Sequence, residues 1–212
     1  MTITEAQPIV NLVLKKDEAW QFVRAAKFAA QHASTDYARP IITTVQITMF
    51  HDELKVRFVG TDSYKLAMVE TWFLEAAPPI DKDITVLIDA KQLLNILPTK
   101  SKLTSVVSII IDDAGLTFQN ETTNFLPAQE GQYPGVAGLM TPWHGRLEGT
   151  DIYAVNPTHM AKIMTCFKQI ADRSEAPVKV IQQDRMRPIG FEMDQLDLMN
   201  VKSLLMPVRI TS

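Results

Sequence analysis

The chain has 212 residues, of which 46% are hydrophobic and 21% charged, and its formal net charge is −3. These values are typical of an ordinary folded protein, and they exclude both a disordered chain and a simple basic nucleic-acid binder that neutralises many phosphates. The single cysteine, Cys166, excludes an internal disulfide framework. No apolar run approaches the roughly 18 residues that span a bilayer, and the N-terminus lacks the pattern of a signal peptide, so we expect a cytoplasmic protein without a membrane segment.

The first predicted elements are a strand over residues 9–14 and a helix over residues 17–33. Asp17 is the expected N-cap of this helix. Its apolar residues share one face, which predicts a core-facing side with Trp20, Val23, Ala26 and Ala30. The opposite side carries Arg24, Lys27 and Gln31 at helical spacing, a polar and basic stripe.

An antiparallel meander follows over residues 41–72. Apolar residues alternate with polar residues from Ile41 to Met49, again from Leu54 to Phe58, and a third time from Tyr64 to Trp72. This period of two predicts strands with one buried face. The polar residues 51–53 form the expected turn between the first two strands.

The same plan begins again after the linker at residues 75–79. A strand at 84–88 leads to Asp89, the expected N-cap of a short helix at 90–97 that carries Lys91 on its polar side. A hairpin at 106–120 and a strand at 122–127 follow, and Gly115 provides the turn. Residues 131–149 have the glycine and proline content of a connecting loop.

A third series occupies the C-terminal part of the chain. A strand at 152–155 runs into Asn156, an expected N-cap, with Pro157 at the first position of a helix that ends near residue 171. Lys162 and Arg173 lie on the polar side of this helix. Strands are predicted at 178–182, 188–193 and 203–210.

The order of strand, capped helix and antiparallel meander therefore occurs three times, at intervals of about 65 to 75 residues. Repeats of this kind predict an α+β protein of β-α-βββ units with helices on one face of antiparallel sheets. Each helix has a stripe biased to Lys, Arg, Gln and Asn, whereas the acidic residues lie mainly on strand edges, turns and linkers. A small basic surface for a polyanion and an ordinary solvated surface both fit this pattern.

The sequence offers little support for catalysis. The four histidines are scattered without metal-ligand spacing, and no glycine-rich phosphate-binding motif occurs. Asp112 and Asp113 form a carboxylate pair, but they are next to a hairpin turn and are better explained as turn residues. We therefore expect a non-enzyme with no metal and no cofactor, and an enzyme that uses a carboxylate pair is the remote alternative.

Several segments in the right order resemble the bacterial DNA polymerase III β subunit, the sliding clamp. Residues 39–43 (RPIIT) and 61–67 (TDSYKLA) are similar to the RPIL and TDGHRLA segments of its middle domain. Residues 205–210 (LMPVRI) are similar to its terminal MPMRL, and Tyr133-Pro134 stands where its FPDY occurs. Ser63 and Tyr64 replace the glycine and histidine of the family.

The resemblance implies a sliding-clamp fold shortened to a clamp domain at residues 1–140, similar to the middle domain, and a half-domain at 150–212, similar to the end of the last domain. In this family the helices touch DNA phosphates without reading sequence. The corresponding DNA-facing residues are Arg24, Lys27, Lys91, Lys162 and Arg173. The family also binds short partner peptides in a pocket, which here corresponds to Arg39, Thr61, Ser63, Tyr64, Lys65, Leu66, Pro134, Met206, Pro207, Val208 and Arg209.

The implied function is that of a ring-shaped processivity factor that encircles duplex DNA and tethers a replicative polymerase. A polymerase and clamp-loader-type proteins would bind through short linear motifs. If the ring keeps about twelve helices, about four chains with three helices each would close it by identical head-to-tail contacts, with a dimer or trimer as the other possibilities. The alternative is a clamp-like adaptor or decoy that captures clamp-binding peptides without encircling DNA.

Overall fold

A computed structural model describes residues 10–51, 53–73, 82–140, 154–171, 177–181, 187–196 and 199–208. The helices are α1 Lys16–Ala30, α2 Ala90–Ile96 and α3 Pro157–Ile170, with short 3-10 turns η1 Pro40–Thr43, η2 Lys100–Lys102 and η3 Ala137–Leu139. The strands are β1 Val10–Lys15, β2 Thr44–Phe50, β3 Lys55–Thr61, β4 Lys65–Trp72, β5 Ile84–Asp89, β6 Val106–Asp112, β7 Gly115–Gln119, β8 Thr123–Pro127, β9 Lys179–Ile181, β10 Ile189–Leu196 and β11 Met199–Leu205.

The predicted repeat is present. Two units, β1-α1-β2-β3-β4 and β5-α2-β6-β7-β8, are complete, and the third contains α3, β9, β10 and β11. The predicted strand at 152–155 falls partly outside the described residues, where only Ala154 forms an isolated bridge with Val208. The three units account for the periodicity that the sequence indicates.

The first two units exchange their first strands. β1 pairs antiparallel with β6 to give a sheet of order β1-β6-β7-β8, and β5 pairs antiparallel with β2. The third unit extends the second sheet, because β11 pairs with β4 from Met199 opposite Thr71 to Leu205 opposite Lys65. The resulting order is β5-β2-β3-β4-β11-β10-β9. Each of the first two units therefore supplies one strand to the sheet of the other.

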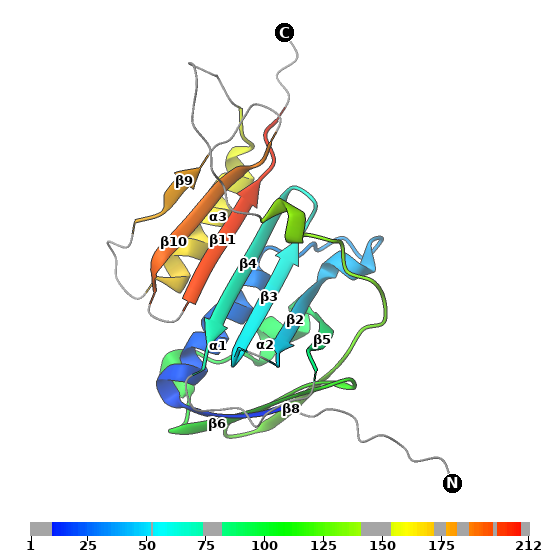
Figure 1. The fold of residues 1–212 in the computed structure, drawn as a ribbon, viewed down its shortest axis with the longest axis vertical. Coiled ribbons are helices and arrows are strands. Elements are labelled where there is room, and N and C mark those ends of the chain that lie inside the picture. The colour runs from blue at the N-terminus through cyan, green and yellow to red at the C-terminus, as the bar shows by residue number, and fades with distance from the viewer. Residues whose placement is uncertain are drawn as a thin grey trace.

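The three helices lie behind the seven-stranded sheet in the view of Figure 1, and the four-stranded sheet crosses the lower end of the molecule. Helices on one face of antiparallel sheets are the layering that the sequence predicts. Helix α1 occupies the centre of this layer, with α2 and α3 packed beside it.

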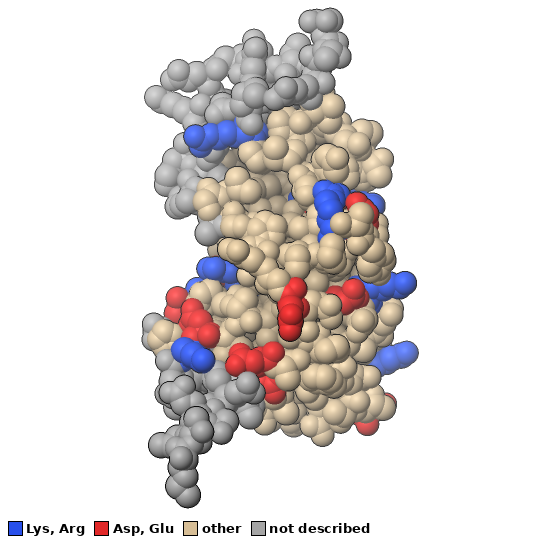
Figure 2. Space-filling view, turned by 90° about the vertical axis from the view of Figure 1, so that its right-hand side faces the viewer, with Lys and Arg blue, Asp and Glu red and all other residues tan. Residues whose placement is uncertain are grey.

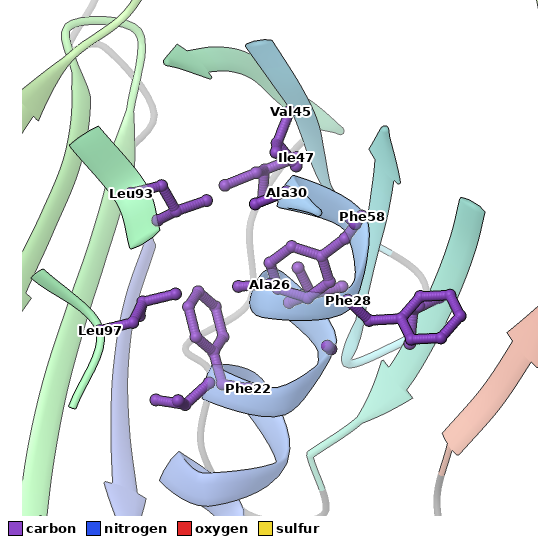
Figure 3. Close-up of a cluster of buried hydrophobic side chains, with 14 of the residues drawn as sticks. Phe22, Ala26, Phe28, Ala30, Val45, Ile47, Phe58, Leu93 and Leu97 are labelled. Atoms are coloured by element: carbon purple, nitrogen blue, oxygen red, sulfur yellow. The ribbon is translucent and has the colours of Figure 1, made fainter. Parts of the chain in front are cut away.

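The core is built around α1, as Figure 3 shows. The Phe22 ring meets the edge of Phe58 with a centroid distance of 5.0 Å, and Phe28 meets Phe167 at 5.0 Å. Phe22 and Phe28 lie outside the predicted core face, because α1 packs against strands of both sheets as well as two helices and is buried nearly all round. Gly60 allows the close approach: a Cβ on it would lie 1.9 Å from the carbonyl oxygen of Ala29.

Two predicted boundaries are wrong. Helix α1 begins at Lys16 rather than with Asp17 as its N-cap, because the Glu18 carboxylate accepts the N–H of Lys15 at 3.0 Å and orders the first turn earlier. Strand β11 spans Met199–Leu205 rather than 203–210, since pairing with β4 fixes its ends.

His32 is not a surface histidine. Its side chain is fully buried, its Nδ1–H donates to the carbonyl oxygen of Phe28 at 2.9 Å, and its Nε2 accepts from Ser203 Oγ at 3.0 Å. Burial, together with the nearby positive charge of Lys65, lowers the pKa of His32 to about 3. The neutral ring therefore joins α1 to β11.

Candidate functional site

The turn between β3 and β4 is held by its own side chains. Thr61 Oγ1 donates to the carbonyl of Lys65 at 2.9 Å and accepts the N–H of Ser63 at 3.1 Å. Asp62 Oδ1 accepts the N–H groups of Tyr64 and Lys65 at 3.0 and 2.8 Å. The turn is therefore a rigid platform, on which Tyr64 projects into solvent.

Ser63 adopts a left-handed backbone conformation with φ of 77°. The resembling motif has glycine here, the residue that accepts this conformation without a steric penalty. Serine keeps the same turn at a cost of about 1–2 kcal/mol. Its hydroxyl oxygen accepts from Arg39 Nη1 at 3.1 Å.

Lys65 points away from the surface. Its ammonium donates to the carbonyls of Gln31 and His32 at the C-terminal end of α1, at 3.2 and 2.8 Å, and lies 3.1 Å from Asp62 Oδ2. Burial lowers the pKa of Lys65, and the Asp62 carboxylate opposes that shift. Burial would raise the pKa of Asp62, but Lys65 and the backbone N–H groups of the turn hold it below its ordinary value. This ion pair caps α1.

An apolar pocket of about 180 Å³ lies beside this turn. Its walls come from the β3–β4 turn, the ends of β4 and β11, and the segment at 134–139. The lining residues are Ile42, Thr61, Ser63, Tyr64, Lys65, Leu66, Pro134, Gly135, Val136, Leu139, Pro188, Leu204 and Met206. Met206 is 43% exposed at its mouth, and the Met206 N–H donates to the carbonyl of Tyr64 at 2.9 Å.

The structure brings together seven of the eleven residues predicted for the peptide pocket: Thr61, Ser63, Tyr64, Lys65, Leu66, Pro134 and Met206. Arg39 stands next to the pocket through its bond to Ser63. Pro207 and Val208 are not in the lining, and Val208 instead donates its N–H to the carbonyl of Ala154 at 2.8 Å. Arg209 lies outside the described residues.

Sequence reasoning missed part of the pocket wall, including Val136, Leu139 and Pro188. Tyr133 anchors this segment, because its buried hydroxyl donates to the carbonyl of Val59 at 3.3 Å. Burial raises the pKa of Tyr133. The Tyr133-Pro134 pair was the only signal for this segment, and its apolar neighbours had no periodicity that could assign them to a wall.

The pocket rim also touches α3. The Tyr64 ring stacks on His159 with a centroid distance of 5.5 Å, and His159 Nδ1 lies 3.9 Å from Asp62 Oδ2. The rim is thus in contact with both the sheet junction and the helix layer.

The basic stripe of α1 is not the exposed, DNA-facing surface that was predicted. Arg24 is only 6% exposed, and its Nη1 donates to the carbonyl of Ile170, the last residue of α3, at 2.6 Å. Lys27 Nζ donates to the carbonyl of Pro98, just after α2, at 2.8 Å, and burial lowers its pKa. These cations satisfy carbonyls at the ends of the neighbouring helices, so the α1 stripe lies in the seams between helices rather than on an open face.

Three further residues, Gln31, Gln169 and Cys166, complete this seam. Gln31 Nε2 donates to Gln169 Oε1 at 2.7 Å, and the Cys166 thiol donates to Gln31 Oε1 at 2.9 Å. Cys166 is buried, and burial raises the pKa of its thiol to about 11. The contacts join α1 to α3.

The exposed cations of the helix layer lie on α2, η2 and α3. Lys91 and Lys162 are exposed, as predicted, and no acidic residue occurs within α2 or α3. Three more lysines of these elements are exposed: Lys100, Lys102 and Lys168. Arg173 lies outside the described residues. In Figure 2 the helix side of the sheet forms the right margin, where Lys and Arg side chains project.

The candidate carboxylate pair holds a turn. Asp112 Oδ1 accepts the N–H groups of Ala114 and Gly115 at 2.9 and 3.1 Å. Within the described ranges no group of three or more His, Cys, Asp or Glu side chains could hold a metal ion. No described helix is long and apolar enough to cross a membrane.

Repeated β-α-βββ units with one helix layer behind antiparallel sheets define the DNA-clamp fold. The chain belongs to the DNA polymerase III beta subunit family, the bacterial sliding clamps: the model of the family's central domain matches residues 13–135. No curated protein sequence matches the chain significantly.

Solved clamp structures share the fold over nearly the whole chain. The Streptococcus pneumoniae DNA polymerase III beta chain superposes with a TM-score of 0.70 at 18% identity, covering 99% of this chain and 67% of that one. The Bacillus subtilis sliding clamp gives 0.69 at 17% identity, covering 100% of this chain and 66% of that one. The Helicobacter pylori clamp bound to a DNA ligase peptide gives 0.71 at 14% identity, covering 99% and 68%. The chain thus spans about two thirds of their length.

Proposed function

We propose that this chain is the subunit of a sliding clamp that assembles with copies of itself into a ring around duplex DNA. Partner proteins, including a polymerase, attach to it through short peptides. The observation that carries the proposal is the apolar pocket at the β4–β11 junction, where Thr61 and Leu66 of the β3–β4 hairpin meet Met206 from the far end of the sequence. The chain acts as a tether and performs no chemistry.

The pocket suits a peptide with large apolar side chains. Leu66, Leu204 and Met206 offer an apolar surface, and the exposed Tyr64 ring stands at the rim. Arg39, which is half-exposed beside Ser63, provides a cation for a polar or acidic flank. Because the β3–β4 turn is already held by its own hydrogen bonds, peptide binding would cost little conformational entropy there.

Peptide binding is tested with matched side chains at the end of the chain. Met206→Ala removes a pocket residue, whereas Val208→Ala removes a residue of similar exposure, 48%, outside the lining. With the ligase peptide that binds the Helicobacter pylori clamp as the probe, we expect Met206→Ala to weaken binding about tenfold, and Val208→Ala to leave it unchanged. Leu66→Ala should also weaken binding. Equal effects of Met206→Ala and Val208→Ala contradict the pocket assignment.

DNA contact is proposed for the exposed lysines of α2, η2 and α3, among them Lys91 and Lys162. Side chains of this kind neutralise phosphates without reading bases, so they permit sliding. A closed ring needs only weak contacts, since escape requires opening or reaching a DNA end. Protein loaded on a circular plasmid should therefore remain bound, and cutting the plasmid once should release it. Retention on linear DNA contradicts encirclement.

A second candidate is an adaptor that captures partner peptides without encircling DNA. The buried positions of Arg24 and the seam position of Lys27 favour it, because they remove two of the cations expected on the DNA-facing wall. The adaptor would be a monomer that binds peptide and shows no difference between circular and linear DNA. Mass in solution together with the plasmid experiment distinguishes the two functions.

A further inference from the structure

Tyr64 and His159 form a stacked pair of rings beside the peptide pocket. Tyr64 belongs to the β3–β4 turn of the first unit, and His159 belongs to the first turn of α3 in the third unit. Their ring centroids are 5.5 Å apart, and the ring planes make an angle of 23°. The pair therefore joins two units that are far apart in the sequence.

The two rings stand in different relations to the pocket. Tyr64 is one of the lining residues and is 58% exposed, whereas His159 is not in the lining. The stack covers one face of the Tyr64 ring. A peptide in the pocket would therefore touch Tyr64, and His159 would support that ring from behind.

The backbone of Tyr64 is fixed by the turn, but its ring needs separate support. The Tyr64 N–H donates to Asp62 Oδ1 at 3.0 Å, and its carbonyl accepts the N–H of Met206 at 2.9 Å. Within the described ranges, the stack with His159 is the only ring contact of Tyr64. Tyr37, which is 62% exposed, stacks on no described ring. An exposed side chain that must be ordered on binding costs affinity, and a ring that is already oriented does not.

The position of the His159 ring is not explained by hydrogen bonding. Its Nδ1 is buried and has no hydrogen-bond partner among the described residues. The nearest carboxylate oxygen, Asp62 Oδ2, is 3.9 Å away, which is beyond hydrogen-bond distance, and it pairs with Lys65 instead. A buried polar atom without a partner costs stability. The stack on Tyr64 is the contact that gives this ring a role.

We propose that His159 is a positioning residue of the peptide site, which holds the Tyr64 ring in the orientation that meets a bound peptide. The inference rests on the proposed function, because it requires that the pocket binds peptides. An aromatic pair of this kind changes an equilibrium constant by about two- to tenfold. His159 thus contributes to affinity without touching the peptide.

A double-mutant cycle tests this role, with the ligase peptide that binds the Helicobacter pylori clamp as the probe and calorimetry as the measurement. His159→Ala should weaken binding about two- to tenfold, and Tyr64→Ala should weaken it at least as much. Adding His159→Ala to Tyr64→Ala should cause no further loss, because His159 acts through the Tyr64 ring. His159→Phe keeps a flat ring and should bind within about twofold of the wild type. Thr158→Ala is the control, since Thr158 is exposed in the same helical turn and is not in the pocket lining.

Unchanged binding in His159→Ala, additive losses in the double variant, or no rescue by His159→Phe overturns the proposal. Additive losses are the result expected if His159 only stabilises α3 or touches the peptide directly. NMR reads the stack without peptide: the ring protons of His159 should shift in Tyr64→Ala, which removes the neighbouring aromatic ring, and an absent shift also overturns the proposal. A wild type that does not bind the peptide contradicts the proposed function itself, whereas binding without coupling between the two residues contradicts only the role of His159.

Discussion

The pocket turn and the helix layer differ in how well their residues were predicted. The pocket residues were predicted from the resemblance to the sliding clamps, whereas the basic stripes were predicted from polar residues at helical spacing. At the β3–β4 turn, residues adjacent in sequence are adjacent in space, and seven predicted residues line one pocket. On α1 the helical spacing of Arg24 and Lys27 was right, but these side chains reach the ends of neighbouring helices. A short turn motif carries its own geometry, whereas the surroundings of a helix face depend on which elements pack beside it.

The largest expected effect is the loss of stability on replacing Lys65, a residue of the β3–β4 turn whose ammonium also bonds carbonyls at the end of α1. Lys65→Met removes the cation that pairs with Asp62 and the donor to the carbonyls of Gln31 and His32, just after α1. We expect a loss of about 2–3 kcal/mol in the free energy of unfolding, because the partly buried Asp62 carboxylate loses its cation and the two carbonyls lose a charged donor. Urea unfolding measures this loss, and Lys168→Met, on an exposed lysine of α3, is the control.

The same pair predicts a pH dependence. The pKa of Asp62 is lowered in the folded state, so its contribution to stability is present above its unfolded pKa and is lost as the pH falls through the folded pKa. The stability difference between wild type and Lys65→Met should therefore shrink in acid. A difference that is constant across this range shows that the ion pair does not act as inferred.

A smaller effect on stability distinguishes the buried cation Arg24 from the exposed cation Lys162. Arg24→Ala leaves the carbonyl of Ile170 without this donor and should cost about 1–3 kcal/mol of stability. Lys162→Ala should barely change stability. In DNA binding the order reverses: the slope of log K against log salt should fall by about 1 for Lys162→Ala and stay the same for Arg24→Ala. A changed slope in Arg24→Ala places that side chain on the DNA.

The smallest effect is at Ser63. Ser63→Gly restores the residue that suits a φ of 77° and should raise the free energy of unfolding by about 0.5–1 kcal/mol, despite the loss of the bond from Arg39. Ser101→Gly in η2, where φ is not positive, should lower it. Thermal unfolding of the two variants measures the contrast, and a destabilised Ser63→Gly shows that the hydroxyl outweighs the strain.

The sequence was sufficient for the repeat, for the caps Asp89 and Asn156, and for the two ends of the pocket. The repeat and the caps depend on side-chain periodicity and local hydrogen bonds, and the pocket ends were predicted from their resemblance to the motifs of the sliding clamps. It was insufficient for the burial of Arg24 and His32, because a polar residue looks the same in sequence whether it faces water or a carbonyl of another element. The pairing of β11 with β4, which sets the pocket's width, is likewise a long-range contact.

The exchange of first strands affects how the protein folds while it is being synthesised on the ribosome. Val10 pairs with Ile111, so β1 leaves the exit tunnel long before its partner has been translated. The apolar side chains of Leu12 and Leu14 therefore stay exposed to solvent until β6 has been synthesised. Pairing between strands so far apart in the sequence also slows folding. Nascent chains stalled before β6 should therefore depend on chaperones, and those released after β8 should not.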